Sequence, residues 1–304
     1  MNYMDVRHLD LLRELADRGT VTAVAAATHR TPSAVSQQLR AAGREAGVPL
    51  VEAHGRGLRL TRAGRLLADG AVEVAVSLAR VQADLEALRD APQGLVTIGA
   101  LPSAAEVLLP ELLVRLRGSE IRIEFDDFDI AESAFAERAV DHDIVIGHTL
   151  TADAPEGADH LHRVTIAREP LDVALPRGHR LARHRTLTPD QVVGEPWIAV
   201  PIGYPLETIL TAIENATGRR IERVQRLRDN RVVEALVAAG VGLAVLPRFT
   251  TRPRSGVVTR PLAGVGAARY IVALSRRDVA ERLAIRTVLG HLVDIGGRVA
   301  SAGA

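Results

Sequence analysis

The chain has 304 residues, a formal net charge of +1 and no cysteine, which excludes disulfides, cysteine zinc sites and cysteine nucleophiles. Hydrophobic residues make up 47% and charged residues 25%, the composition of a globular protein long enough for two or three domains. All 38 basic residues are arginine, which excludes a Schiff-base or phosphate-loop lysine, and the 3% of aromatic residues are too few for the stacking platforms of single-strand binders.

Charge is distributed unevenly along the chain. The first 62 residues hold nine arginines and six acidic residues, whereas the remaining residues carry a net charge of −2. Between positions 30 and 62 there are six arginines and only two acidic residues. A basic unit at one end of a near-neutral chain predicts a polyanionic partner at that end.

Targeting and membrane signals are missing from the sequence. No apolar run of about 18 residues occurs, so we expect no membrane span and no membrane partner. The first ten residues are charged and lack an apolar core. We therefore expect no signal peptide and a cytoplasmic location.

Three short helices are predicted before residue 50. Apolar residues at helical spacing predict a first helix that ends at Gly19, and an alanine-rich helix follows over 21–28. After a tight turn at His29, Thr31 is expected to cap a third helix with Pro32 at its first position, running to about residue 46.

The third helix has two different faces. Its apolar stripe consists of Val35, Leu39, Ala42 and Ala46. The opposite face carries Ser33, Ser36, Gln37, Arg40 and Arg44. This pattern fits a helix in a DNA major groove, although an ordinary surface helix would look similar. The short helix and turn before it, with Ala25 at the expected crossing, favour a helix-turn-helix.

A basic hairpin and a long helix are expected next. Residues 48–51 and 58–61 predict two strands joined by a glycine-containing tip, which is typical of a wing beside a DNA-binding helix. One helix is predicted from Thr61 to about residue 90. Its apolar residues form a seam in which successive members are alternately four and three positions apart. The seam consists of Leu67, Ala71, Val74, Leu78, Val81, Leu85 and Leu88. It predicts a two-stranded coiled coil, and the alternative is a helix buried against its own chain.

The remainder of the chain alternates strands and helices. Two successive sets of alternating strands and helices are expected, the first beginning with a strand at 95–99 and the second with a strand at 197–200. Between them, separate strands are expected at 161–167 and 171–175. Helices are expected at 131–140 and, as the closing element, at 280–293. We therefore predict an α/β body with mostly parallel sheets, built as two lobes with a cleft between them.

Four segments of the first 64 residues carry a family resemblance. Val21-Thr-Ala-Val-Ala-Ala-Ala-Thr28, Thr31-Pro-Ser-Ala-Val-Ser-Gln-Gln-Leu39, Gly47-Val-Pro-Leu50 and Leu60-Thr-Arg-Ala-Gly64 resemble the N-terminal region of LysR-type transcriptional regulators. Leu108-Leu-Pro110 and the stretch from Val237 to Pro247 are similar to the effector domain of that family. The resemblance covers essentially the whole chain, strongly at the front and loosely behind.

The resemblance implies a DNA-binding transcriptional regulator, not an enzyme, without cofactor or metal. It implies an all-α winged helix-turn-helix over 1–61, a dimerisation helix over 62–90 and a periplasmic-binding-protein-like α/β domain over 94–304. Lobe I of that domain would comprise 94–166 and 268–304, and lobe II would comprise 167–267. The partners would be double-stranded DNA with a dyad operator, a small-molecule effector between the lobes, and further copies of this chain in a homodimer or homotetramer.

Contact residues for DNA and self-association follow from the same resemblance. The expected DNA contacts are Thr31, Ser33, Ser36, Gln37, Arg40, His54, Arg56 and Arg59, with Gln37 and Arg40 on base edges. The expected dimer contacts are Leu67, Val74, Leu78, Val81, Leu85 and Leu88. Two departures from the family matter. Gly43 predicts a frayed helix end, and Val51 with Ala53 removes one expected phosphate contact.

Effector contacts are expected where strands end and helices begin. They are Ser103, Ala104, His148, Pro201, Ile202, Gly203, Tyr204, Asp229 and Asn230. Helix N-caps are alternative roles for Ser103 and Asp229. The histidines at 142, 148, 160 and 162 have no ligand spacing for a metal, so surface positions are expected for them.

A solute-binding protein or a small-molecule enzyme with an incidental helical N-terminus is the competing hypothesis. It predicts ligand binding without DNA affinity, and usually an export signal. The basic segment over 30–62 counts against it. DNA binding that weakens steeply with salt would separate the two functions.

Overall fold

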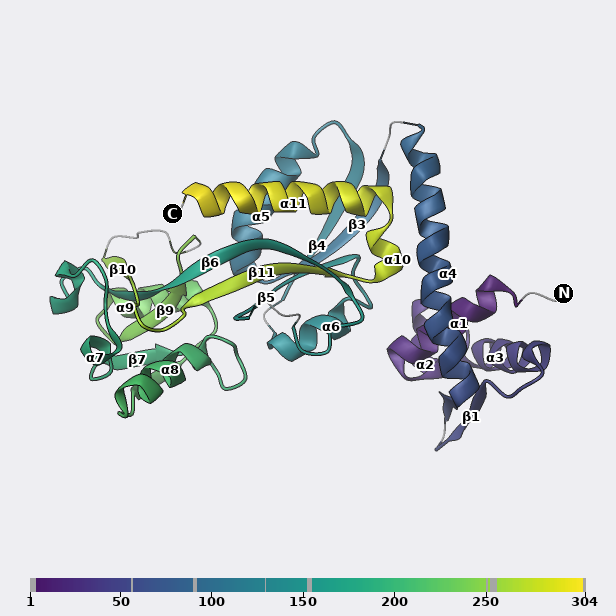
Figure 1. The fold of residues 1–304 in the computed structure, drawn as a ribbon, viewed down its shortest axis with the longest axis horizontal. Coiled ribbons are helices and arrows are strands. Elements are labelled where there is room, and N and C mark those ends of the chain that lie inside the picture. The colour runs from purple at the N-terminus through teal and green to yellow at the C-terminus, as the bar shows by residue number, and fades with distance from the viewer. Residues whose placement is uncertain are drawn as a thin grey trace. The chain divides into compact units, whose positions relative to one another are not determined.

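The computed structural model describes residues 4–55, 57–89, 92–128, 130–151, 155–249, 251 and 256–302. The chain forms two compact units. The first unit contains the residues up to 90 together with 277–283, and the second contains 91–276 and 284–304. Figure 1 labels the helices and strands of both units.

The first unit begins with three helices, α1 (Val6–Arg18), α2 (Val21–Ala27) and α3 (Pro32–Ala46), as the sequence predicts. Asp5, Thr20 and Thr31 cap their first turns by accepting backbone N–H groups. Between α2 and α3 the chain turns at His29, which has a φ of +53°. The short antiparallel hairpin of β1 (Val51–His54) and β2 (Gly57–Leu60) follows.

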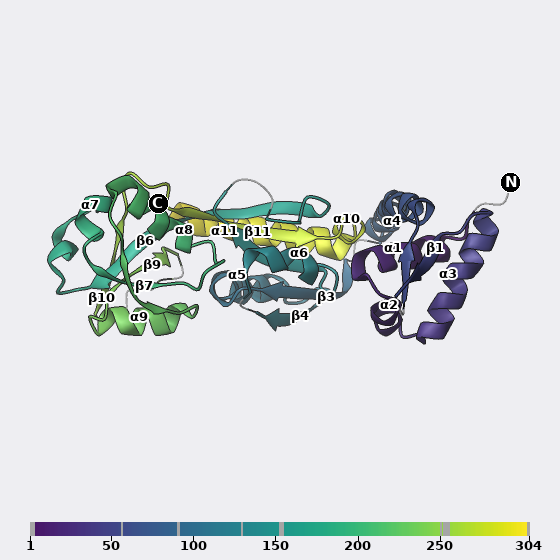
Figure 2. The same ribbon diagram turned by 90° about the horizontal axis from the view of Figure 1, so that it is seen from below.

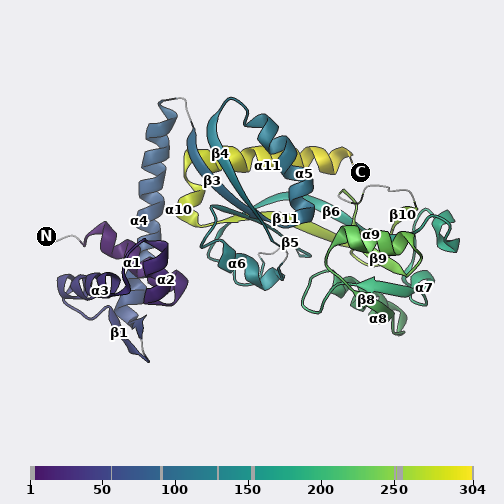
Figure 3. The same cartoon turned by 180° about the vertical axis from the view of Figure 1, so that it is seen from behind.

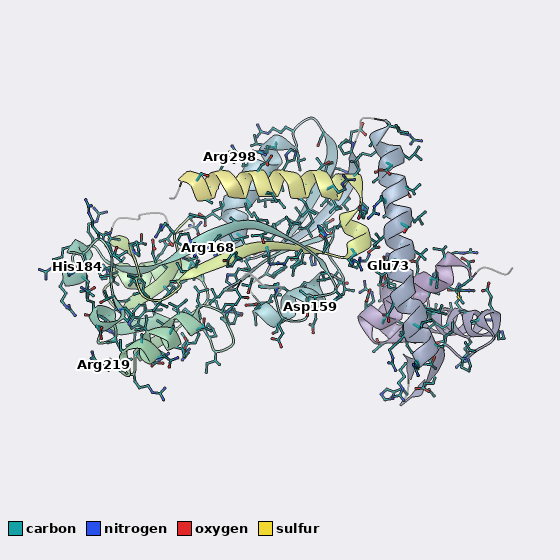
Figure 4. All side chains as sticks on the ribbon, viewed as in Figure 1. Glu73, Asp159, Arg168, His184, Arg219 and Arg298 are labelled. Carbon is teal, nitrogen blue, oxygen red and sulfur yellow. The ribbon has the colours of Figure 1, made fainter. Side chains whose placement is uncertain are left out.

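Helix α4 (Arg62–Ala87) completes the first unit, with α10 (Arg277–Ala280) packed on it. Arg277 donates to Glu73 of α4 over 2.8 Å, and Arg80 donates to Glu281 over 2.8 Å; Glu73 is labelled on α4 in Figure 4. The core under these helices is aliphatic. Its most buried members are Leu12, Val24, Val35, Leu39, Ala42 and Leu50.

The expected fraying of α3 at Gly43 is wrong. The helix continues to Ala46 and ends at Gly47, whose φ of +69° is the left-handed conformation that suits glycine. A Cβ on Gly43 would lie 3.2 Å from the Val48 carbonyl oxygen. The missing side chain therefore allows the strand leading into the hairpin to pass close to α3.

The second unit contains one mixed sheet. Its order is β4-β3-β5-β11-β6-β9-β7-β8, and β10 pairs with β6. The pairs β3–β4, β3–β5, β7–β8 and β7–β9 are parallel, whereas β6, β10 and β11 pair only in antiparallel fashion. The strands are β3 (Gln93–Ala100), β4 (Glu120–Asp127), β5 (Ile144–Thr149), β6 (His162–Pro176), β7 (Pro196–Ala199), β8 (Glu222–Arg226), β9 (Leu243–Pro247), β10 (Val257–Pro261) and β11 (Ala268–Ser275).

The two separate strands expected at 161–167 and 171–175 are one strand, β6. Pro170 lies within it and does not break it. Its carbonyl accepts from Arg248 over 3.0 Å, and the next residue, Leu171, donates to the Ala267 carbonyl. One end of β6 pairs with β11 and the other with β9 and β10, so the sheet continues from one set of strands to the next.

Helices cover this sheet. Figure 3 shows α5 (Pro102–Arg115) with β3 and β4 at one end, and α8 (Glu207–Thr217) and α9 (Asn230–Ala238) with β7 and β8 at the other. Helix α11 (Leu283–Ala302) lies along β6 and β11 in Figures 1 and 2. The expected closing helix over 280–293 is thus two helices, α10 and α11. The remaining helices are η1 (Glu132–Ala134), α6 (Phe135–Arg138), η2 (Arg180–Arg183) and α7 (Pro189–Val192), the first two replacing the helix expected over 131–140.

Buried residues form separate clusters in the second unit. The single tryptophan, Trp197, lies fully buried in one of them and donates its indole N–H to the Val192 carbonyl over 3.0 Å. A smaller cluster packs β9 against α9 around Val237. None of the helices in the described parts of the chain is long and apolar enough to cross a membrane.

Gly64 tests the packing of α4 on the hairpin. A Cβ on Gly64 would lie 2.0 Å from the Leu50 carbonyl oxygen, whereas a Cβ on Gly70 of the same helix would meet nothing within 4 Å. We expect Gly64→Ala to destabilise the first unit by about 1–3 kcal/mol or more, because backbone must move. Gly70→Ala should be neutral or stabilise the helix by up to about 1 kcal/mol. Thermal unfolding of both variants measures this, and equal melting temperatures would contradict it.

Candidate functional site

The outer face of α3 is the candidate nucleic-acid interface. Ser33, Gln37 and Arg40 are exposed on it, and Ser36 is half-buried. Thr31 accepts the Ala34 N–H over 3.2 Å and contacts the Ser33 hydroxyl, so its oxygen already serves as the helix cap. Within the described chain Arg40 forms no ion pair with an acidic residue, so its guanidinium is available to a ligand.

The hairpin presents fewer free cations than expected. Arg59 lies opposite Glu52 in the strand register and donates to its carboxylate over 2.7 Å. His54 is exposed beside the tip. Arg56 lies outside the described residues. The pairing of Arg59 with Glu52 was not predicted, although the register of a hairpin over these residues places the two opposite each other.

Two further exposed arginines near α3 were not among the expected DNA contacts, although Arg44 was expected on the polar face of the helix. Arg30, in the turn before α3, donates to Gln38 over 2.7 Å. Arg44 is exposed one turn after Arg40. Both belong to the basic segment over 30–62, which could have indicated them.

Helix α4 has one buried and one exposed face. Ala68, Val76 and Ala83 are buried in the first unit. The predicted seam lies on another face and begins with Leu67, which is half-buried, and Ala71, which is buried. The exposed fractions of its remaining members are Val74 40%, Leu78 56%, Val81 67%, Leu85 52% and Leu88 83%.

A cavity of about 360 Å³ opens in the second unit. It is bordered by the start of α5, the ends of β5 and β9, the loop at 200–206, the start of α9 and the beginning of β11. Five of the predicted effector residues line it. They are Ser103, His148, Tyr204, Asp229 and Asn230.

Four predicted effector residues lie outside the cavity lining. Ala104 is buried within α5, and Ile202 is 80% exposed. Pro201 and Gly203 belong to the same loop as Tyr204, but only the tyrosine, with Pro205 and Leu206 after it, borders the cavity. Tyr204 accepts a hydrogen bond from Arg228 over 3.1 Å.

A buried ion pair that the sequence analysis missed lies at the cavity wall. Arg269 of β11 and Glu169 of β6 are 2% and 0% exposed. Arg269 Nε donates to Glu169 Oε2 over 2.7 Å, and the Phe249 backbone N–H donates to Oε1 over 2.6 Å. Arg269 Nη2 also lies 2.7 Å from Oε2, but it is not aligned to donate to it and has no hydrogen-bond partner in the described chain.

Arg269 also contacts two of the predicted residues. Its Nη1 donates to Ser103 Oγ over 3.0 Å and to His148 Nδ1 over 3.2 Å. Ser103 is therefore not the N-cap of α5, a position that Leu101 holds. Asp229 is an N-cap, since its carboxylate accepts the N–H groups of Arg231 and Val232.

His148 is not a surface histidine, contrary to the expectation for this group. It is nearly fully buried, with its ring against Phe135 at a centroid distance of 6.2 Å. Burial, together with the positive charge of Arg269, lowers the pKa of His148 from 6.5 to about 3. His148 is therefore neutral near neutral pH. No group of three or more potential metal ligands occurs among the described residues.

The lowered pKa of His148 makes stability depend on pH. Below about pH 6.5 the unfolded chain binds a proton that the folded chain excludes, so stability falls with pH by about 1.4 kcal/mol per unit down to about pH 3. His148→Gln should remove this component, whereas His160→Gln, at an exposed position, should not. Urea unfolding followed by Trp197 fluorescence at several pH values measures the slopes. Identical slopes for all three proteins would contradict the assignment.

Comparisons with known proteins agree with this architecture. Residues 6–65 match the family described as "Bacterial regulatory helix-turn-helix protein, lysR family", and residues 89–296 match the "LysR substrate binding domain". The chain is 28% identical to the HTH-type transcriptional regulator CatR of Pseudomonas putida over 90% of this chain and 93% of CatR. It is 27% identical to the transcriptional activator protein LysR of Escherichia coli over 86% and 83% of the two chains.

A solved structure supports the fold. Full-length OxyR of Pseudomonas aeruginosa aligns with a TM-score of 0.60 and 16% identity, covering 97% of this chain and 98% of that chain. The resemblance seen in the sequence and the predicted fold class are therefore confirmed. The chain belongs to the LysR family of DNA-binding transcriptional regulators and carries the effector-binding domain of that family.

Proposed function

We propose that α3 enters the DNA major groove with Gln37 and Arg40 on base edges. The observation that carries this is the exposed polar face of α3, free of acidic residues before Glu45, on a helix whose other face is buried. Gln and Arg can each form two hydrogen bonds to a base edge. Thr31, Ser33 and Ser36 lie at the start of α3 and would contact phosphates, as side chains at helix N-termini do.

The hairpin would act as the wing. His54, Arg56 and Arg59 would face the DNA backbone or minor groove. The ion pair of Arg59 with Glu52 is exposed and therefore weak, so a phosphate can replace the carboxylate at small cost.

Self-association would use the seam on α4. Leu67, Val74, Leu78, Val81, Leu85 and Leu88 would pack against the same residues of a second copy, as in a coiled coil. A symmetric dimer presents two copies of α3 to the two halves of a dyad operator. Contacts between further copies would complete a tetramer.

The cavity of the second unit would bind the effector and control the regulator. A ligand that binds one arrangement of the lobes better than another shifts the population toward it. We assign the winged helix-turn-helix to 1–61, the dimerisation helix to 62–90 and the effector domain to 94–304, with lobes over 94–166 with 268–304 and over 167–267. Such a protein works by binding and is not an enzyme, and it acts in the cytoplasm, where a bacterial genome lies.

Substitution of Arg40 tests the groove assignment. Selection from random-sequence duplexes with the wild-type protein should enrich a dyad sequence. On that sequence Arg40→Ala should lose about 1–3 kcal/mol of binding free energy with an unchanged melting temperature. Arg7→Ala, an exposed arginine on α1 paired with Asp5, should bind as the wild type does. Fluorescence anisotropy measures the affinities, and equal loss in both variants, or no enriched sequence, would contradict the proposal.

Charged substitutions in the seam test self-association. Leu78→Glu with Leu85→Glu should raise the dissociation constant of the dimer more than about tenfold, because each buried leucine contributes about 1.5–3 kcal/mol. Leu66→Glu with Ala87→Glu adds the same charges to exposed positions of α4 outside the seam and should leave the dimer intact. Sedimentation velocity distinguishes them, and an intact oligomer in the seam variant would refute this role.

A further inference from the structure

Three side chains that line the cavity in the second unit, Ser103, His148 and Arg269, are arranged as hydrogen-bond donors toward a ligand. Arg269 cannot accept a hydrogen bond, so Ser103 Oγ and His148 Nδ1 must both act as acceptors toward it. The hydroxyl proton of Ser103 is therefore directed away from Arg269. For the same reason His148 carries its proton on Nε2. Neither proton has an acceptor among the residues that the structure describes.

Arg269 contributes a further donor. The guanidinium is planar, and one of the two Nη2 protons points away from Nε. This proton lies on the same edge of the group as Nη1, the nitrogen that contacts Ser103 and His148. Nη2 is buried without a hydrogen-bond partner in the described chain. Because an unmatched buried donor costs free energy, this edge favours a ligand that supplies an acceptor.

The start of α5, to which Ser103 belongs, adds to these donors. Its N-cap, Leu101, offers no side-chain acceptor, and Pro102 has no N–H. The positive end of the helix dipole is therefore not covered by a side chain. The other helix that begins at the cavity, α9, is different, because the carboxylate of Asp229 already caps it. An anion in this cavity would therefore lie at α5.

The charges around the cavity limit the charge of the ligand. Arg269 is paired with Glu169, and Arg231 is paired with Glu106 over 2.7 Å. The lining also contains Arg228, Asp229 and Glu234, so three arginines and three acidic residues border the cavity. His148 is neutral, because its pKa is lowered to about 3. Donors without a large net positive charge suit one negative charge spread over two oxygens, whereas a phosphate dianion would need another unpaired cation.

The rest of the wall is half apolar and half polar. Its apolar residues are Leu101, Pro102, Ile130, Val200, Pro205, Leu206 and Pro247, and its polar residues are Glu106, Tyr204, Arg228, Asp229, Asn230, Arg231 and Glu234. The volume of about 360 Å³ falls within the range of about 300–1,000 Å³ that is usual for pockets of small organic ligands.

We propose that this cavity takes a small organic monocarboxylate, with its carboxylate oxygens on Ser103, His148 and Arg269 and its hydrocarbon part against Leu101, Ile130 and Leu206. The inference rests on the proposed function of the cavity as the effector site, and it names the class of effector. Arg269, held by Glu169, is the residue that determines this specificity.

Binding of matched acids and amides to the full-length protein tests the proposal. The probes are butyrate, hexanoate and benzoate at millimolar concentration, the corresponding primary amides, and phenyl phosphate. At least one acid should raise the melting temperature and give a calorimetric binding isotherm. Its amide and phenyl phosphate should bind at least about tenfold more weakly, since a charged hydrogen bond is worth about 1.5–3 kcal/mol.

Two variants locate the bound carboxylate. Ser103→Ala should weaken binding of the acid at least about tenfold, the value of one hydrogen bond to a charged group. Ser119→Ala, whose hydroxyl donates to the Leu116 carbonyl near the opposite end of α5, should not. Arg269→Gln combined with Glu169→Gln avoids a buried unpaired charge and should abolish the preference for acid over amide, whereas Glu169→Gln alone should keep it.

The outcomes separate this inference from the proposed function. No binding of any of the three acids, equal binding of acids and amides, or equal affinities of Ser103→Ala and Ser119→Ala would overturn the inference. If the amides bind as tightly as the acids and Ser103→Ala weakens both equally, the cavity would be an effector site for neutral ligands. Loss of the DNA binding expected for α3 would overturn the proposed function while the acid-binding result stands.

Discussion

The buried ion pair between Glu169 and Arg269 is the interaction on which the second unit depends most. Both groups leave water on folding, and the hydrogen bonds that they make beyond the pair offset part of that cost. The Phe249 N–H takes the second carboxylate oxygen, and Ser103 and His148 take two of the arginine protons. Removing one partner of such a pair typically costs about 3–5 kcal/mol. The hydrogen bonds that stabilise the pair between β6 and β11 thus also orient the polar groups of the cavity.

The continuity of β6 explains why the cavity lies where it does. β6 pairs directly with β9 of one parallel set, and it reaches the other parallel set, β3 to β5, through β11. The carboxyl ends of β5 and β9 and the first residues of α5 and α9 meet beside this strand. Ligands of open α/β sheets bind at such strand ends, where backbone groups and helix termini are not used by the sheet itself.

Local signals in the sequence predicted the first unit well, because its helices begin and end at residues with a strong local preference. Thr31, Pro32 and Gly47 mark α3 without reference to any distant residue. The cavity was predicted only in part. Glu169 and Arg269 are 100 positions apart, and nothing in either neighbourhood indicates that they pair. Pro170 lies between the two strands expected at 161–167 and 171–175, and its missing N–H breaks a strand only where the neighbouring strand needs a donor, which a single sequence does not reveal.

The pairing of arginines in the first unit distinguishes structural cations from those available to DNA. Arg7, Arg13, Arg18 and Arg59 each have an acidic partner. In the described chain, the arginines without an acidic partner include Arg30, Arg40 and Arg44, in α3 or in the turn before it. The chain has nearly as many acidic as basic residues, and on α1 acidic residues neutralise the arginines. The three arginines at α3 have no such acidic neighbours in the described chain. Because these arginines lie close to Gln37, positive charge is concentrated at one surface of the first unit. A polyanion binds most strongly to arginines of this kind, because it does not first have to displace a carboxylate from them.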